Sequence, residues 1–352
     1  MKTIKISRNR SIGANQPVFI IAEAGINHNG DLRLAKKMID MAKSCKVDAI
    51  KFQTFKAEEF IADPRQTITY TSQGKVITES AIKMFKRYQF SEAEWKEISS
   101  YCRKRGIIFF STPQNPSDLD MLLKITDMPI IKVGSDDLTN LELMKYYASK
   151  NKPMIISAGM AYLSEIGDAV SAIRREGNNK LAVLHCVASY PAKAEQVNMR
   201  KMNAIGKKFD LITGFSDHTE GIEACVVATA MNAKVIEKHF TLDRNLPGPD
   251  HWFSSDPEEL KELVKAVRSA EMMMGSATLE PTKMELLTRK DARRSIVAKT
   301  DIKKGEPITD RTLEFKRPGT GLPPKYKDKI IGKKAARAIK KGKMIKKGDY
   351  IN

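Results

Sequence analysis

Short hydrophobic runs alternate with amphipathic stretches along the first three quarters of the chain. Runs rich in β-branched residues predict strands, and the stretches between them, with apolar residues every three or four positions, predict helices. The expected strands are residues 18–23, 48–53, 107–111, 130–134, 153–157, 181–186, 210–215 and 233–238, and the clearest helices are residues 31–45, 91–105, 219–231 and 256–273. Strands that each precede a helix, eight times over, predict a (β/α)8 barrel, the TIM-barrel fold of the α/β class.

An open, doubly wound sheet is the alternative fold. It is less favoured because the first strand runs into AEAGINHNG (22–30), which lacks the GxGxxG spacing of a dinucleotide-binding turn. The connection 54–90 separates the second strand from its helix. A loop of that length is typical of a functional element such as a lid.

The hydrophobic pattern changes after about residue 274. Residues 274–294 form a polar stretch with some helical character, which we interpret as a linker. Residues 295–352 contain short strand-like runs and a degenerate repeat, DIKKGEPI at 301–308 and AIKKGKMI at 338–345. We therefore expect a barrel domain at 1–273, a linker, and a small β-rich domain that leans on a neighbour because its core is marginal.

Basic residues are concentrated near the C-terminus. The formal net charge is +19, and from residue 289 onward the chain has 21 Lys and Arg against 7 Asp and Glu, a net of +14. That segment has few aromatic residues for base stacking and no nucleic-acid motif, so we expect no nucleic-acid partner. No apolar run approaches the roughly 18 residues of a membrane span, and no signal peptide is evident. We expect a cytoplasmic protein whose four scattered cysteines stay reduced.

Two histidines stand at the ends of neighbouring strands. In a barrel of this type the functional side chains lie at the C-terminal ends of the strands. His218 and His239 follow the seventh and eighth strands, so their imidazoles can converge on one divalent ion. Two nitrogen ligands completed by water and substrate oxygens suit Mn2+, Fe2+ or Co2+ better than a closed zinc site. The alternative is a pair of unrelated histidines.

Lysines and hydroxyl groups form a second set on the same rim. Lys51 and Lys132 end apolar strands, where an unpaired ammonium group is costly to bury. Together with Thr112, Ser135, Ser157 and Ser216 they predict a receptor for a phosphate and a carboxylate. A single lysine could instead reach solvent, but this is strained for two. The acids of the rim, candidates for proton transfer or for binding sugar hydroxyls, are Glu23, Asp137, Glu237 and Asp250.

An ordered set of segments resembles the sialic acid synthase family. The segments are IAEAGINHNG (21–30), KFQTFK (51–56), STP (111–113), KVGS (132–135), SAGM (157–160), HCVASYP (185–191), GFSDHT (214–219), EKHFTLDR (237–244) and GPDH (248–251). The end of the chain, with FKRPGTG at 315–321, is similar to the antifreeze-like (SAF) domain of that family. The resemblance implies a (β/α)8 barrel whose mouth is covered by the SAF domain of a partner in a domain-swapped homodimer.

The resemblance also implies the roles of the rim residues. Phosphoenolpyruvate and an N-acylated amino sugar would be condensed, with Mn2+, or alternatively Mg2+ or Co2+, held by His218 and His239. Lys51, Thr112, Lys132, Ser135, Ser157 and Ser216 would bind phosphoenolpyruvate. Glu23, Gln53, Tyr190 and Asp250 would face the sugar, and Arg317 would come from the partner. Glu23, Asp250, Lys51 and Lys132 are the expected catalytic residues.

Departures from the family pattern bear on the acceptor. Members that make N-acetylneuraminate typically have a glutamate in place of Asp137 and an asparagine in place of Ala188, and they carry an aromatic residue where this chain has Arg293 and Arg294. We therefore expect 2,4-diacetamido-2,4,6-trideoxymannose, the legionaminate-type acceptor. The alternatives are N-acetylmannosamine, a pseudaminate-type acceptor, a 3-deoxy-aldulosonate phosphate synthase acting on a sugar phosphate, and a non-catalytic sugar- or nucleic-acid-binding protein.

Overall fold

The first of two compact units is a closed barrel of eight parallel strands. The structure, a computed structural model, describes residues 2–351, and the units divide between Gly275 and Ser276. The barrel strands are β3 (Phe19–Gly25), β4 (Ala49–Thr54), β7 (Ile108–Pro113), β8 (Ile131–Val133), β9 (Met154–Ser157), β10 (Leu181–Cys186), β11 (Ile212–Asp217) and β12 (Val235–His239). Each overlaps a predicted strand, and the predicted (β/α)8 barrel is confirmed.

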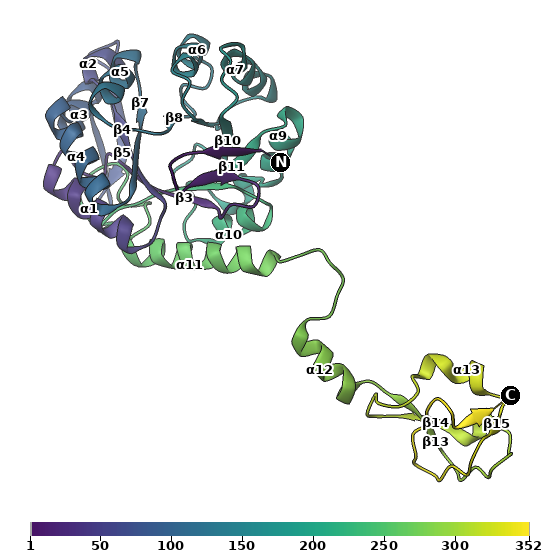
Figure 1. Cartoon of the computed structure of the whole chain (residues 1–352). Helices are drawn as coiled ribbons and strands as arrows, with labels where there is room; N and C mark the ends of the chain where they lie inside the picture. Colours follow the sequence, from purple (N-terminus) through teal and green to yellow (C-terminus); the bar gives the residue numbers. More distant parts are fainter. Residues whose placement is uncertain (1, 352) are drawn as a thin grey trace. The chain divides into compact units, whose positions relative to one another are not determined.

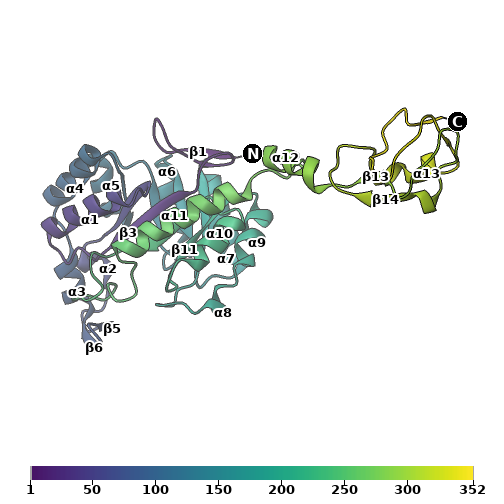
Figure 2. The same cartoon turned by 90° about the horizontal axis from the view of Figure 1, so that it is seen from below.

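Helices surround the strands (Figures 1 and 2). They are α1 (Leu32–Ser44), α4 (Glu92–Arg105), α5 (Pro116–Ile125), α6 (Leu141–Ser149), α7 (Leu163–Arg175), α8 (Ala194–Val197), α9 (Arg200–Phe209), α10 (Glu223–Ala230) and α11 (Pro257–Met274). Local chemistry sets their ends: a capping box of Ser91 and Glu94 starts α4, and Gly106, at φ 68°, ends it in the left-handed conformation. The strands read as continuous apolar runs because barrel interior and helices bury both faces.

The connection between β4 and α4 is structured. It contains α2 (Ala57–Phe60), an antiparallel hairpin of β5 (Thr67–Ser72) and β6 (Lys75–Ser80), and α3 (Ala81–Tyr88). The expectation of one long loop was wrong here, because apolar and aromatic side chains of the connection pack into a small core with Ile26. Another hairpin, β1 (Thr3–Lys5) and β2 (Ser11–Gly13), adds buried isoleucines to the barrel core.

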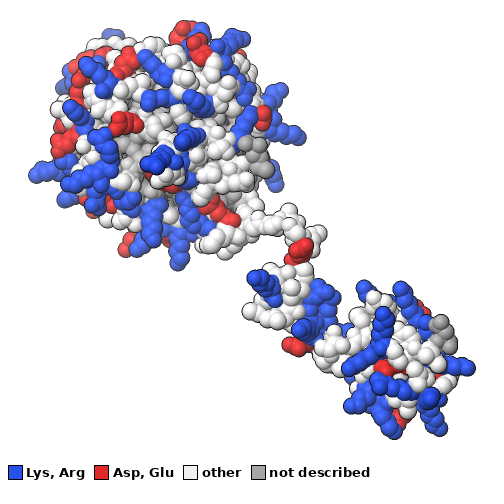
Figure 3. Space-filling view, viewed as in Figure 1, with Lys and Arg blue, Asp and Glu red and all other residues white. Residues whose placement is uncertain are grey.

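The second unit is a small module of short strands. It contains α12 (Lys283–Ala292), β13 (Ser295–Ala298), β14 (Leu313–Lys316), the 3₁₀ turns η1 (Asp310–Thr312) and η2 (Pro324–Tyr326), α13 (Lys327–Ile330), β15 (Lys334–Ala335) and β16 (Tyr350–Ile351). The two copies of the repeat pair, because Ile302 and Ile339 exchange backbone hydrogen bonds of 2.8 Å. Basic side chains are spread over its visible surface (Figure 3). Within residues 2–351, no helix is long and apolar enough to cross a membrane.

Two buried histidines make the barrel sensitive to acid. His28 is fully buried and stacks on Phe90, with ring centroids 4.2 Å apart. Burial lowers the pKa of His28 to about 3 and the pKa of His251 to about 4. Below about pH 6.5 the unfolded chain therefore binds protons that the folded barrel does not bind. The free energy of unfolding consequently falls as the pH falls from about 6.5.

We predict that His28→Gln makes this pH dependence shallower. One histidine contributes a slope of about 1.4 kcal/mol per pH unit between its folded and unfolded pKa values. Urea unfolding of the barrel at steps between about pH 5.5 and 4.5 should show the wild-type slope reduced by that amount in the variant. An unchanged slope would show that His28 is not buried as the neutral imidazole.

Candidate functional site

A cavity of about 380 Å3 opens among the C-terminal ends of the barrel strands. Most of the residues that the sequence pointed to line it: Glu23, Lys51, Gln53, Thr112, Lys132, Ser135, Ser157, Tyr190, Ser216, His218 and His239. Glu237 lies among them. Because parallel strands end at one rim, residues more than 200 positions apart in the chain face a common space.

Four charged side chains form a buried cluster in this cavity. Lys51 Nζ lies 2.9 Å from Glu23 Oε1 and 3.8 Å from Glu237 Oε1. Lys132 Nζ lies 3.9 Å from the same Glu237 oxygen. All four side chains are at most 6% exposed. We call Glu23, Lys51, Lys132 and Glu237 the rim cluster.

Strand register explains part of the rim cluster. Glu23 is the cross-strand partner of Lys51 on β3 and β4, and Ser216 is the partner of Glu237 on β11 and β12. Cross-strand partners stand at the same level of the barrel and project from the same face. Glu23 and Lys51 therefore meet at one level of the rim, whereas Glu237 lies two residues lower and Lys132 approaches it from β8 across the barrel.

Hydroxyl groups complete the surroundings of the two lysines. Lys51 Nζ donates to Thr112 Oγ1 at 3.0 Å, and Lys132 Nζ donates to Ser157 Oγ at 2.6 Å. Ser216 Oγ donates to Glu237 Oε1 at 3.1 Å. These contacts hold each ammonium group in a fixed position, with polar oxygen atoms at the wall of the cavity. Such a wall suits a small anion that carries several oxygens.

The two glutamates of the rim cluster differ in their pKa shifts. Burial raises the pKa of Glu23, although the nearby Lys51 opposes the shift. Burial also acts on Glu237, but Lys132 and Lys51 outweigh it and lower the pKa of that carboxyl. Glu237 therefore stays ionised as the counter-ion of the lysines, whereas Glu23 is the better candidate for proton transfer.

The pKa values of the two lysines are also shifted in opposite directions. Burial acts to lower the pKa of Lys51, but Glu23 and Glu237 together raise it above its ordinary value. Burial lowers the pKa of Lys132, which Glu237 offsets only in part. An incoming anion close to Lys132 would compensate the cost of burying its charge.

The geometry of the histidine pair fits a divalent metal ion. The ring centroids of His218 and His239 lie 5.3 Å apart. His218 Nδ1 lies 2.8 Å from Val187 O, which can only accept, so this nitrogen carries the proton and Nε2 keeps its lone pair. His239 Nδ1 is buried and has no hydrogen-bond partner among residues 2–351. Burial lowers the pKa of both histidines, which keeps the rings neutral as metal ligands must be.

Two imidazoles are the protein's contribution to such a site. The described part of the chain has no group of three or more His, Cys, Asp or Glu side chains arranged around a common metal position. The nearest carboxylate to the pair is that of Asp250, whose Oδ2 lies 3.9 Å from His239 Nδ1. A bound ion would therefore keep several positions for water and substrate oxygens, which suits Mn2+, Fe2+ or Co2+.

Asp250 lies beside the cavity, next to Gly25. At φ 50° Gly25 has the left-handed conformation, and a Cβ there would lie 3.5 Å from Glu23 Oε1, 3.6 Å from Gln53 Nε2 and 3.7 Å from Asp250 Oδ2. These three side chains therefore gather around one glycine. Burial, and then the charge of Glu23, raise the pKa of Asp250 to about 7.

Two other predicted residues are not in the described lining of the cavity. At the end of β8 the lining contains Asp136 instead of Asp137, because the chain turns after Val133 and the alternation of the strand stops. Burial raises the pKa of Asp137 to about 6. Arg317 belongs to the second unit. The roles of Asp137 and Arg317 stay predictions.

Other residues that line the cavity were not predicted from the sequence. They include Phe60, Phe85, Gln114, Asp136, Met160 and Cys186. Phe60 and Phe85 pack edge to face, with ring centroids 5.0 Å apart, in the connection that was expected to be a loop. Gln114 could have been found, since it directly follows the strand end at STP.

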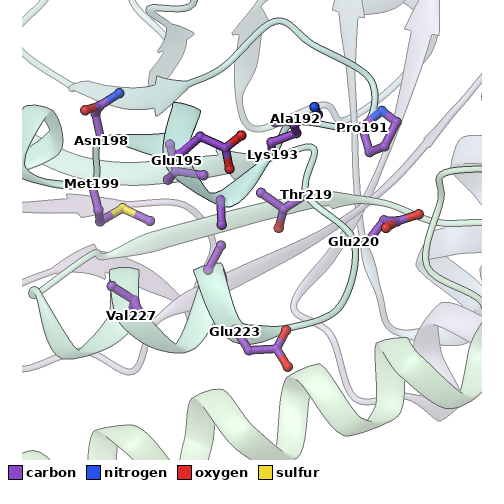
Figure 4. Close-up of a pocket in the computed structure, with 13 residues that line it drawn as sticks. Pro191, Ala192, Lys193, Glu195, Asn198, Met199, Thr219, Glu220, Glu223 and Val227 are labelled. Atoms are coloured by element: carbon purple, nitrogen blue, oxygen red, sulfur yellow. The ribbon is translucent and has the colours of Figure 1, made fainter.

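A larger cavity of about 660 Å3 lies elsewhere on the barrel unit, between α8 and α10. Figure 4 shows Glu195, Glu220 and Glu223 around it, and Val227 and Met199 on its apolar side. Among its described lining residues Lys193 is the one cation, and histidine is absent. This lining lacks the paired lysines and paired histidines of the rim cavity, so we assign the candidate site to the rim.

Comparisons with known proteins agree with the fold. A model of the NeuB family matches residues 38–278, and a model of the SAF domain matches residues 293–351. The chain is 38% identical to the N,N'-diacetyllegionaminic acid synthase of Legionella pneumophila over 342 residues, 96% of each chain. It is 34% identical to a pseudaminic acid synthase of Campylobacter jejuni over 346 residues, 97% of this chain and 98% of the other.

A solved structure is similar as well. It is that of the N-acetylneuraminic acid (sialic acid) synthetase from Leptospira borgpetersenii serovar Hardjo-bovis in complex with citrate. The TM-score is 0.74 at 36% identity, covering 82% of this chain and 95% of the other. The predicted C-terminal SAF domain is confirmed.

We predict that Glu237→Gln destabilises the barrel. The change removes the carboxylate that lies within 4 Å of both buried ammonium groups, 3.8 Å from Lys51 and 3.9 Å from Lys132. Breaking a buried ion cluster in this way costs about 3–5 kcal/mol. Urea unfolding should detect the loss, whereas Glu142→Gln, which breaks an exposed pair with Lys145, should leave the midpoint unchanged. Equal stability of Glu237→Gln and wild type would contradict the role of Glu237 as counter-ion.

Proposed function

This chain belongs to the NeuB family, and we propose that it is a nonulosonic acid synthase. It condenses phosphoenolpyruvate with an N-acylated amino hexose, releases phosphate, and forms a carbon–carbon bond. The observation that carries the proposal is the presence of a buried lysine pair and a neutral histidine pair in one cavity. The first suits the phosphate and carboxylate of one substrate, and the second suits the metal that activates the other.

Phosphoenolpyruvate would occupy the part of the cavity that contains the two lysines. Lys51 and Lys132 neutralise its negative charge, and hydroxyl groups beside them bind its oxygens. Thr112 and Ser157 already accept hydrogen bonds from these lysines, at 3.0 and 2.6 Å, so they also hold the ammonium groups in place. Ser135 and Ser216 supply further hydroxyl groups to the lining. When the phosphate leaves, the same two cations stabilise its charge.

His218 and His239 would hold the metal ion. Bound there, Mn2+, or alternatively Mg2+ or Co2+, would supply Lewis acidity to the aldehyde of the open-chain sugar. The protein keeps both rings neutral by burial and orients His218 through its bond to Val187 O. Tyr190 packs against His218, with ring centroids 4.2 Å apart, and shields this side of the pair.

The reaction joins carbon 3 of phosphoenolpyruvate to the aldehyde carbon of the sugar. Carbon 2 becomes cationic and takes up water, and the tetrahedral intermediate expels phosphate by cleavage of the carbon–oxygen bond. Glu23 is our candidate for the proton transfer at the water or at the aldehyde oxygen. Its pKa is raised by burial, and Oε2 has no hydrogen-bond partner among residues 2–351. Asp250 and Gln53 bind sugar hydroxyls beside it.

The acceptor that we propose is 2,4-diacetamido-2,4,6-trideoxymannose. Ala188 lines the cavity and offers no side-chain amide to a sugar hydroxyl. Phe60 and Phe85 add an apolar wall, which suits the methyl group of a 6-deoxy sugar better than a hydroxymethyl group. The similarity to a legionaminate-type enzyme, at 38% identity, supports this choice over the pseudaminate type, at 34%. N-acetylmannosamine is the other alternative.

The SAF domain of a second copy would complete the site. In this proposal the chain forms a domain-swapped homodimer in which Arg317 reaches the cavity of its partner. The support is the family resemblance together with the apolar side chains that α12 exposes, namely Met284, Leu286 and Leu287. Exposed apolar residues on one helix are typical of a surface that binds a partner.

The acceptor panel is the test of the proposed function. Phosphate release from phosphoenolpyruvate with Mn2+ should require an acceptor and be fastest with 2,4-diacetamido-2,4,6-trideoxymannose. N-acetylmannosamine and the altrose isomer should be slower, by about 10-fold or more, because they leave polar groups of the site or the sugar unmatched. Mass spectrometry should identify the nine-carbon keto acid. If phosphoenolpyruvate releases phosphate only in the presence of a phosphorylated sugar, the chain is better interpreted as a 3-deoxy-aldulosonate phosphate synthase. If no acceptor supports phosphate release and yields a keto acid, both hypotheses fail.

We also predict the effect of removing one metal ligand. His239→Ala should lower metal-dependent turnover by at least about 100-fold, since even substitutions in the outer shell of a metal site cost about 10- to 100-fold. The control is His185→Asn, because His185 is also buried but bonds Val197 O and is absent from the described lining of the cavity. It should retain activity. Full activity of His239→Ala would remove this residue from the site.

A further inference from the structure

A second buried ion pair lies directly behind the two histidines. Successive residues of a strand point to opposite faces, so Asp217 and Lys238 face the helices, whereas the residues on either side of them face the cavity. Asp217 and Lys238 are cross-strand partners on β11 and β12. Lys238 Nζ lies 2.7 Å from Asp217 Oδ2, and the side chains are 4% and 0% exposed. We call Asp217 and Lys238 the outer pair.

Both carboxylate oxygens of Asp217 and the ammonium group of Lys238 have hydrogen-bond partners. Asp217 Oδ1 accepts from Thr219 N and from Thr219 Oγ1, both at 2.8 Å. Asp217 Oδ2 accepts from Lys238 Nζ and from Cys225 Sγ of α10, the latter at 3.2 Å. Lys238 Nζ also donates to Thr219 O at 2.7 Å. The network thus joins β12 to the residues on both sides of His218.

The backbone ladder between the two strands ends at this pair. Asp217 and Lys238 are the last partners of β11 and β12, and His239 pairs with Glu23 of β3 instead. Beyond the ladder, the contact of Lys238 with Thr219 O is a bond between β12 and the segment that carries His218. Beyond the last backbone partners, this side-chain network therefore links the two strand ends that carry the imidazoles.

Stability alone is a weak reason for a buried ion pair. Removing two charges from water costs free energy, and apolar side chains of similar size often serve the fold as well. An ion pair with directed hydrogen bonds does, however, fix distances and angles more strictly than apolar contacts do. Asp217 and Lys238 each directly precede one of the two histidines. The geometry that the outer pair fixes is therefore that of His218 and His239.

We propose that Asp217 and Lys238 are positioning residues that set the separation of His218 and His239 for a divalent ion. The inference rests on the proposed function, since it assumes that the histidine pair binds the metal. The outer pair touches neither substrate nor metal. It acts through the strand ends, and a change of a few tenths of an ångström in the imidazole separation would weaken the affinity for the metal.

The test is the double variant Asp217→Asn, Lys238→Met in the full chain. It removes both charges and keeps the side-chain sizes similar. Titration of the metal-free protein with MnCl2, followed by calorimetry, should give a Kd about 10- to 100-fold weaker than that of the wild type. Thermal unfolding of the same metal-free protein should change little. Unchanged Mn2+ affinity, with or without a loss of stability, would mean a purely structural role and overturn the proposal.

Further variants keep the result decisive. If the double variant does not fold, Thr219→Val removes one bond to Asp217 Oδ1 and should still weaken Mn2+ binding several-fold; unchanged affinity overturns the proposal.

Asp118→Asn is the matched control, because Asp118 is also a fully buried carboxyl but lies on α5, after β7, four strands from β11 in the barrel order. It should bind Mn2+ as the wild type does, and a loss as large as in the double variant overturns the proposal.

The wild type separates this inference from the proposed function. If the wild-type chain binds Mn2+ and His239→Ala does not, a normal affinity in the double variant defeats the positioning role alone. If the wild type does not bind Mn2+, the metal assignment and the positioning role both fail.

Discussion

The rim cluster is the constraint on which the site depends. Burying two lysines and two glutamates at the mouth of a barrel has a large desolvation cost, and only close pairing offsets it. Here one carboxylate oxygen of Glu237 lies within 4 Å of both ammonium groups, at 3.8 and 3.9 Å. The closed barrel makes this possible, because Lys51 approaches Glu237 from β4, two strands away, while Lys132 approaches the same oxygen from β8 on the opposite side of the barrel.

This arrangement shifts the pKa values of the two buried glutamates in opposite directions. Glu237 is held as a carboxylate by the lysines, while burial raises the pKa of Glu23. The histidines are kept neutral by the same burial. Two buried glutamates, two lysines and two neutral histidines therefore share about 380 Å3. In our proposal the cations bind phosphoenolpyruvate, and the outer pair behind the wall holds the metal ligands apart.

The barrel and much of its rim could be predicted because their signals are periodic. Each of the eight strands is a buried apolar run, and residues such as Lys132 and His239 stand out as polar groups at the ends of such runs. The hairpin β5–β6 and the aromatic wall of Phe60 and Phe85 escaped prediction, because a small local core has no long-range period. The choice between Asp136 and Asp137 depends on a turn whose geometry the pattern does not encode.

The outer pair illustrates the same limit. The sequence shows Asp217 before His218 and Lys238 before His239, yet their meeting depends on the register of two strands. Register is a tertiary property, and a slip by one residue would turn the histidines outward. In the second unit, likewise, the repeat was visible, but the pairing of Ile302 with Ile339 was not.

The most direct measurement is a crystal structure of the chain with phosphoenolpyruvate and MnCl2, with data collected at the manganese absorption edge. We predict an anomalous peak coordinated by His218 and His239, and phosphate density in contact with Lys51 and Lys132. Manganese bound by other residues, or phosphoenolpyruvate bound outside the rim cavity while that cavity is open to solvent, would contradict this prediction.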